Sequence, residues 1–238
     1  MTGTNDMNDM SSDDGIRLAK RVADVAACSR AEAERYIAGG WVSVDGVLAE
    51  DPASRVTLAQ DVVLLPGATP IEPEPVTILL HKAVGMDMDA ALAAINAETQ
   101  VLEHGRGKPF LRRHLFKLQP ATPLEDSGSG LVVFSQDWRV MRKLVEDAPR
   151  NEYEYVVEVD GQILDGGLDK LNRMFKASWQ NETRLRIAGK NIQRGQIARL
   201  LGDVGLAVVS LRRLRIGRIS MGSLPVGGWR FLREVERF

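Results

Sequence analysis

The sequence predicts an α+β protein in two parts, a small N-terminal domain and a larger C-terminal domain. Helical and strand-like segments are mixed along the 238 residues without the strict alternation of a parallel α/β sheet. Four prolines and a glycine within residues 66–75 indicate a semi-rigid linker between the domains. Residues 1–14 are polar, with four aspartates and no basic residue, and we expect them to form a disordered acidic tail. The expected domains are therefore 15–65 and 76–238.

The small domain should contain two helices followed by three strands. Residues 16–28 have apolar side chains at helical spacing, and Ser29 begins the pattern of a capping box for a second helix over 30–38. Strand-like alternation follows, and the pair Asp45-Gly46 predicts a tight hairpin turn.

The larger domain should form a mixed sheet with several short helices. The spacing of its apolar residues and the lengths of its apolar segments predict strands at 76–80, 131–134, 153–159, 207–214 and 229–234, and helices at 88–97, 137–147 and 193–204.

The composition excludes several classes of protein. The single cysteine, Cys28, rules out a disulfide framework and a cysteine-rich zinc site, and the three histidines are scattered, so we expect no metal. Because the chain shows no signal peptide and no apolar run of membrane-spanning length, we expect a cytoplasmic protein without a membrane partner. The formal net charge of −1 is segregated, with strongly basic stretches at 104–119 and 190–218, as expected of a nucleic-acid binder.

Spaced features of the N-terminal domain resemble the S4-type RNA-binding domain. They are Ile16 to Arg21, Ser29 to Arg35, Ile37, Gly39, and the hairpin Val42-Ser-Val-Asp-Gly46. The resemblance implies that basic side chains of the two helices face phosphates. These side chains are Arg17, Lys20, Arg21, Arg30 and Arg35. On charge alone a solvated face is an equal alternative, because acidic residues interleave with them.

Residues 76–238 carry motifs in the order and spacing of one enzyme family. These are His81-Lys82-Ala-Val-Gly85, Tyr155-Val-Val-Glu-Val-Asp-Gly161, Gln196-Ile197, Leu211-Arg-Arg-Leu-Arg-Ile-Gly217, Leu224-Pro225, Gly227 and Trp229-Arg230. They resemble the catalytic domain of the pseudouridine synthases that modify ribosomal RNA. Such enzymes extrude the target nucleotide, detach uracil from its ribose, rotate it and rejoin it through carbon, without a cofactor or metal. The resemblance implies a carboxylate, a basic partner for it, and an aromatic ring against the base.

The residues at these catalytic positions differ in part from the family pattern. The family motif Gly-Arg-Leu-Asp-x-x-Thr-x-Gly-Leu aligns with residues 122–131, which places Glu125 at the aspartate and Asp126 beside it. Ala198 stands where the family has the first arginine of Gln-Ile-Arg-Arg, whereas the tyrosine is kept as Tyr155. A glutamate is one methylene longer, and a displacement of about 1 Å can cost about a hundredfold in rate.

Two interpretations follow from these differences. In the first, Asp126 or Glu125 supplies the carboxylate, Tyr155 stacks on the base, and Arg199 or Arg194 replaces the missing arginine. In the second, the site is inactive and the chain is an RNA-binding or ribosome-assembly factor.

Further basic residues of the larger domain are candidates for RNA contacts. They are Lys82, Arg112, Arg113, Arg194, Arg212, Arg213 and Arg215, with a solvated strand face as the alternative for the last three. We expect the four tryptophans, Trp41, Trp138, Trp179 and Trp229, to serve packing; if it is exposed, Trp179, in the polar run 176–184, could instead stack on a base. The expected partner is structured RNA, and ribosomal RNA in particular, bound by a monomer.

Overall fold

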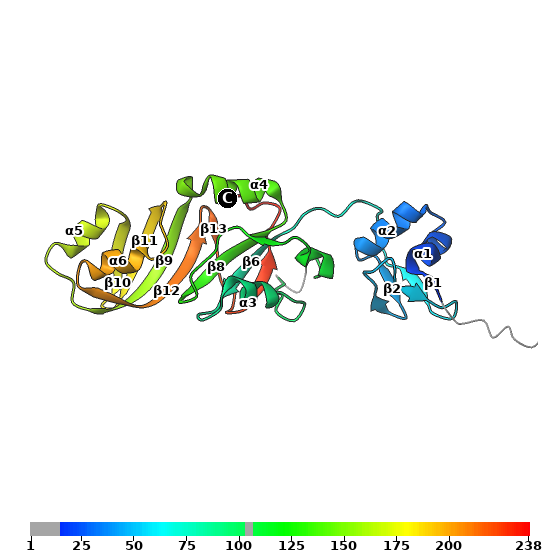
Figure 1. Cartoon of the computed structure of the whole chain (residues 1–238), viewed down its shortest axis with the longest axis horizontal. Coiled ribbons are helices and arrows are strands. Elements are labelled where there is room, and N and C mark those ends of the chain that lie inside the picture. Colours follow the sequence, from blue (N-terminus) through cyan, green and yellow to red (C-terminus); the bar gives the residue numbers. More distant parts are fainter. Residues whose placement is uncertain (1–14, 103–106) are drawn as a thin grey trace, which may run out of the picture. The chain divides into compact units, whose positions relative to one another are not determined.

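The computed structural model describes residues 15–102 and 107–238, so the acidic tail predicted at 1–14 lies outside the described residues. The chain divides into two compact units (Figure 1). The first comprises the residues up to Glu74 together with Leu111–Arg113, and the second comprises Pro75–Phe110 and His114–Phe238.

The N-terminal unit packs two helices against short strands. Its elements are β1 (Ile16–Arg17), α1 (Leu18–Ala26), α2 (Arg30–Ala38), β2 (Val42–Val44), β3 (Val47–Leu48), β4 (Arg55–Val56) and β5 (Val62–Leu64). Strand β1 pairs with β4, and a separate sheet has the order β3-β2-β5. Buried apolar residues of both helices, such as Leu18 and Ile37, form one core with Val42 and Val62 of the sheet.

Two local sequence signals in this unit, the capping box at Ser29 and the hairpin turn at Asp45-Gly46, are confirmed. The Ser29 side chain accepts a hydrogen bond from the Glu32 amide at 3.2 Å, and the Glu32 carboxylate accepts one from the Ser29 amide at 2.8 Å, which completes the capping box. Asp45 and Gly46 both have positive φ, at 51° and 79°, as the central residues of a tight hairpin of this kind require.

The C-terminal unit is built on one mixed sheet with the strand order β10-β11-β9-β12-β8-β6-β14, to which β13 and β7 are added. Its strands are β6 (Thr77–Lys82), β7 (Gln119–Pro120), β8 (Gly128–Ser135), β9 (Glu152–Gly161), β10 (Lys176–Asn181), β11 (Arg184–Lys190), β12 (Leu206–Ile216), β13 (Ile219–Ser220) and β14 (Trp229–Phe231). The pairing of β12 with β8 is parallel, whereas β12 with β9 and β6 with β8 are antiparallel. The predicted α+β class is therefore correct.

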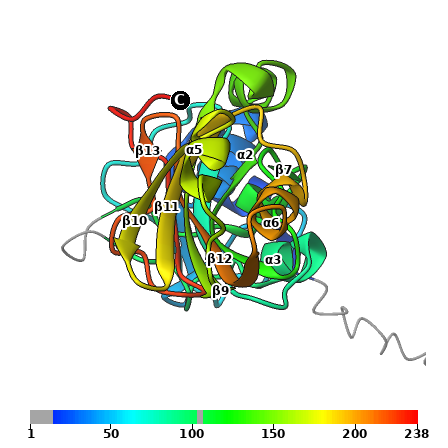
Figure 2. The same ribbon diagram turned by 90° about the vertical axis from the view of Figure 1, so that its left-hand side faces the viewer.

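Short helical segments cover both faces of this sheet. They are α3 (Met88–Ala93), α4 (Trp138–Met141), a π-helical turn η2 (Arg142–Glu146), η3 (Ala148–Arg150), α5 (Gly167–Asn172) and α6 (Gln196–Gly202). A further turn, η1 (Arg112–Leu115), contains residues of both units. Leu171 of α5 and Ile197 and Leu201 of α6 pack on the alternate, buried residues of β9 and β11. Helices α5 and α6 therefore lie on the same face of this end of the sheet (Figures 1 and 2).

Three parts of the larger unit differ from the sequence predictions. The helix predicted at 137–147 is a single α-turn followed by the π-turn η2. The hairpin of β10 and β11 was not predicted, because residues 176–184 are largely polar and show no apolar alternation. Trp229 is fully buried, as predicted, but Trp138 is 64% exposed, so the expectation that it serves packing is wrong.

In the part of the chain that the structure describes, no helix is both long enough and apolar enough to cross a bilayer.

An ion pair holds the segment that follows β14 to this strand. Arg230 donates to both oxygens of Glu236, at 2.7 and 2.8 Å, and Arg233 donates to the same carboxylate at 2.7 Å. Burial opposes ionisation of Glu236, but these hydrogen bonds outweigh it and lower its pKa to about 2.

We expect Glu236→Gln to lower the free energy of unfolding by about 1–3 kcal/mol at pH 7. The ionised carboxylate stabilises the folded state above its unfolded pKa, near 4.5, and this contribution is lost as the pH falls towards 2. Denaturant titrations of both proteins at pH 7, 4.5 and 3 test this. A difference in stability that does not shrink at low pH would contradict it.

Candidate active site

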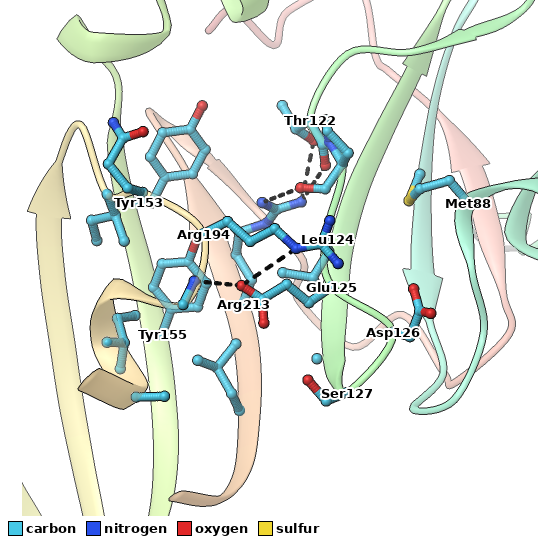
Figure 3. Close-up of a pocket in the computed structure, with 18 of the residues that line it drawn as sticks. Met88, Thr122, Leu124, Glu125, Asp126, Ser127, Tyr153, Tyr155, Arg194 and Arg213 are labelled. Atoms are coloured by element: carbon cyan, nitrogen blue, oxygen red, sulfur yellow. Dashed lines mark hydrogen bonds and ion pairs between the residues drawn. The ribbon is translucent and has the colours of Figure 1, made fainter. Parts of the chain in front are cut away.

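The C-terminal unit contains a pocket of about 820 Å³. Its walls come from the loop before β8, from β9 and β12, from the loop before α6, and from the turns after α4. Of the residues singled out in the sequence, the pocket is lined by Glu125, Asp126, Tyr155, Arg194 and Arg213. Residues more than 80 positions apart in the chain are thus brought to one cavity (Figure 3). Its volume suits a nucleotide-sized ligand.

Hydrogen bonds from Lys82 hold the loop before β8. The Nζ atom of this β6 residue donates to the carbonyl oxygens of Gly128 at 2.8 Å, Ala83 at 3.1 Å and Asp126 at 3.4 Å. The side chain is fully buried, and desolvation lowers its pKa, partly offset by the nearby Asp126. Lys82 therefore cannot reach a phosphate, and its predicted RNA contact is wrong; it is a support of the loop.

Arg213 supports the same loop from β12. Its guanidinium donates to the carbonyl oxygens of Leu131 at 2.7 Å and Thr122 at 2.5 Å, and only 3% of the residue is exposed. Close packing of β8 on β12 makes this possible, because a Cβ at Gly130 would lie 2.2 Å from the Arg213 carbonyl oxygen. The predicted phosphate contact of Arg213 is therefore wrong; it forms part of the pocket wall.

Glu125 is the carboxylate that enters the pocket from this loop. Its Oε1 atom accepts a hydrogen bond from the backbone amide of Gly195 at 2.6 Å and lies 4.0 Å from Nε of Arg194 (Figure 3). Asp126 points away from these groups in the same view and is exposed at the rim. Of the two predicted carboxylates, Glu125 has the geometry of a pocket residue.

The basic partner of Glu125 comes from the loop before α6 and not from α6 itself. Ala198 lines the pocket in the first turns of α6, and Arg199 is exposed and does not line the pocket. Arg194 and the Gly195 amide take the place beside the carboxylate. The Arg194 side chain is 82% exposed, so its ion pair with Glu125 is solvated and weak.

Two tyrosines of β9 line the pocket on the side facing Glu125. Tyr155 is 94% buried and points into the pocket from β9 (Figure 3). Tyr153, two residues earlier and on the same face of the strand, lies with its ring centroid 5.7 Å from the guanidinium carbon of Arg213. Burial raises the pKa of the Tyr153 hydroxyl, so it is protonated at neutral pH. Tyr153 and the Gly195 amide were not predicted as site groups, although Tyr153 stands at the motif position where the resembled family has a lysine, two residues before Tyr155.

Arg215 belongs to the opposite face of the sheet. A bulge in β12 between Arg213 and Arg215 breaks the alternation, so that Arg215 pairs in register with Glu154. Its guanidinium binds Glu152 at 2.7 Å and Glu154 at 2.8 Å, and Glu154 also binds Arg186. Arg215 therefore already pairs with two carboxylates, and its role as a phosphate contact stays a prediction. Arg212, by contrast, is exposed on β12.

The basic residues of the N-terminal unit lie mostly at its surface. Arg17, Lys20, Arg30 and Arg35 are exposed, Arg21 is half-buried, and Arg30 lies 3.3 Å from Glu34. Arg112 is exposed, whereas burial lowers the pKa of the half-buried Arg113. Among the described residues no group of three histidine, cysteine or acidic side chains could hold a metal ion.

Comparisons with known proteins agree with this architecture. Residues 16–63 match the family described as the S4 domain, which indicates RNA binding. The dual-specificity RNA pseudouridine synthase RluF of Salmonella typhi is 28% identical over 95% of this chain and 79% of its own length. An uncharacterised RNA pseudouridine synthase of Mycobacterium tuberculosis is 25% identical over 93% of this chain and 91% of its own length.

A solved structure shows the same fold. The crystal structure of a pseudouridylate synthase superposes with a TM-score of 0.57 at 17% identity, covering 92% of this chain and 97% of that one. The chain thus combines an S4 domain with a mixed-sheet α+β domain, and over most of its length it is similar in sequence, at 25–28% identity, to RNA pseudouridine synthases.

Proposed function

We propose that this chain isomerises uridine to pseudouridine in structured RNA, with ribosomal RNA as the expected substrate and Glu125 as the working carboxylate. The observation that carries the proposal is the position of Glu125, which enters a nucleotide-sized pocket opposite Tyr155. The relatives described above support the reaction class, because they are RNA pseudouridine synthases.

In this proposal the pocket receives one uridine taken out of the RNA stack. The glycosidic carbon–nitrogen bond breaks, the uracil turns, and a carbon–carbon bond forms between the ribose and ring carbon 5. The hydrogen of that ring carbon leaves as a proton and the freed ring nitrogen takes one up, so the product is an isomer and no co-reactant is needed. Glu125 acts at the sugar–base junction as nucleophile or proton acceptor, and Tyr155 packs against the base.

A backbone donor and basic side chains surround the Glu125 carboxylate. The Gly195 amide donates to it, Arg194 lies beside it, and the buried cations of Lys82 and Arg213 hold the loop from which it extends. These contacts fix the position from which Glu125 would meet the sugar–base junction.

A second candidate function is RNA binding without catalysis. The observation that favours it is the solvated position of Arg194, whose ion pair with Glu125 at 4.0 Å is weaker than a bidentate pair within the pocket would be. The experiments below separate the two candidates.

We expect Glu125→Gln to lower the rate of pseudouridine formation by at least about 100-fold, since it removes the carboxylate charge and keeps its shape. Asp126→Asn should change the rate by no more than about twofold, because this side chain is exposed at the rim of the pocket and points away from Gly195 and Arg194. Nucleoside mass spectrometry of unmodified ribosomal RNA incubated with each protein provides the measurement. Loss of product with Asp126→Asn alone would assign the chemistry to Asp126.

A reconstructed variant decides between the two candidate functions. Glu125→Asp combined with Ala198→Arg restores the family's residues at both positions. Product from the wild type supports the enzyme. Product from the reconstructed variant alone, with salt-sensitive RNA binding by the wild type, would mean that the native chain binds RNA and does not modify it.

The two candidate arginines can be compared directly. We expect Arg194→Ala to lower kcat about fivefold, the effect of one exposed ion pair, and Arg199→Ala to leave kcat unchanged. Each substitution removes one cation, so the effect on RNA affinity controls for lost phosphate attraction. Equal losses of kcat would show that Arg194 has no special relation to Glu125.

Lys82 should affect the reaction through the loop and not through RNA contact. We expect Lys82→Met to lower kcat by about tenfold or more, since the Asp126 and Gly128 carbonyl oxygens lose a donor, while RNA affinity is kept. Arg212→Met, at an exposed site on β12, is the matched control and should weaken binding without changing kcat. An affinity loss in Lys82→Met larger than in Arg212→Met would contradict the assignment.

A further inference from the structure

Two aromatic side chains of the C-terminal unit stand in solvent outside the pocket. Phe116 is 69% exposed in the loop after η1, and Trp138 is 64% exposed at the start of α4. Rings of this size usually bury most of their surface, and exposed ones mark interaction sites when they occur together.

The two residues belong to one surface. Gln136, two residues before Trp138, donates from its side chain to the Phe116 carbonyl oxygen at 2.7 Å and to the His114 carbonyl oxygen at 3.2 Å. The strand that follows Phe116, β7, pairs with the end of β8 through Gln119 and Ser135. Phe116 and Trp138 are therefore anchored to the same strand end.

Each ring is accompanied by a cation. Nζ of Lys117 lies 5.2 Å from the ring centroid of Phe116, and the guanidinium carbon of Arg139 lies 5.8 Å from that of Trp138. Rings interleaved with cations are the pattern of surfaces that bind single-stranded nucleic acid, because bases stack on the rings while phosphates meet the charges. We call Phe116, Lys117, Trp138 and Arg139 the aromatic platform.

The aromatic platform is continuous with the pocket. The π-turn η2 follows α4 directly, and its residues Leu144 and Val145 line the pocket. Val145 is itself 53% exposed, and it lies seven residues, or about 10 Å of helix, beyond Trp138. An RNA strand that leaves the pocket past Val145 has only this distance to cover before it reaches Trp138.

We propose that the aromatic platform is a second RNA-binding site, which stacks unpaired bases of the bound RNA on Trp138 and Phe116. It extends the interaction of the S4 domain and the pocket with a preference for RNA that contains a single-stranded segment. The proposal requires RNA binding but not isomerase activity.

The test uses the full chain and two labelled RNA hairpins with the same stem. One carries an extended loop of adenosines, and the other is closed by a minimal loop. Because neither loop contains uridine, failure of the isomerase proposal cannot change the result. We expect Trp138→Ala and Phe116→Ala each to weaken binding of the extended-loop RNA about 5- to 100-fold, with little effect on the minimal hairpin.

Three control variants sharpen the test. Trp138→Phe keeps an aromatic ring and should retain most of the affinity for the extended-loop RNA. Trp138→Leu keeps only an apolar side chain and should lose this affinity as Trp138→Ala does. Met174→Ala removes a side chain that is 56% exposed elsewhere on the unit and should leave both affinities unchanged. Equal losses for both hairpins, or wild-type affinity in Trp138→Leu, would overturn base stacking. Unchanged affinity in both alanine variants would overturn the proposal and leave the surface to a protein partner.

Discussion

Two buried cations determine the position of the pocket's carboxylate. Lys82 and Arg213 come from different strands, and both donate to carbonyl oxygens of the segment that contains Glu125. Removing a charged group from water is costly unless polar groups replace its hydration, and here the loop carbonyls do so. The loop cannot move away without leaving both charges unsolvated, so it stays fixed. Burial is the main cause that lowers the pKa of Lys82, and repulsion by the Arg213 cation adds to it.

The fixed loop determines where the Glu125 side chain can reach. A glutamate on a mobile loop could adopt many positions, but from this loop its longer side chain reaches across the pocket to the Gly195 amide. The position of the Glu125 carboxylate determines which basic residue can lie next to it. An arginine at 198 would sit in α6, whereas Arg194 approaches from the preceding loop, where the structure places it next to the carboxylate. Glu125 and Arg194 therefore lie close enough to form an ion pair.

The sequence predicted those parts of the structure that depend on neighbouring residues. The helix at 30–38 was predicted with its observed bounds because its capping box is local, and the hairpin at Asp45-Gly46 was predicted because its backbone conformation selects those residues. The motif alignment also predicted that Glu125 and Tyr155 belong to one site, and both residues line the same pocket.

The errors concern residues whose surroundings come from distant segments. Lys82 and Arg213 looked like phosphate contacts because burial of a cation cannot be read from its neighbours in sequence. The bulge in β12 that places Arg215 on the other face could not be read from the sequence either. Trp138 was expected in the core, as tryptophans usually are, although no apolar layer covers the start of α4.

The ion-pair ladder around Arg215 has a consequence for how RNA approaches. It lies on the face of β9 opposite to Tyr153 and Tyr155, and there Glu152 and Glu154 pair at short range with Arg215, Arg186 and Lys176. The two carboxylates offset two of the three positive charges, so this cluster projects a weaker field and offers a polyanion fewer counterions to release than three unpaired cations would. This face therefore attracts a polyanion less strongly than its number of basic side chains suggests.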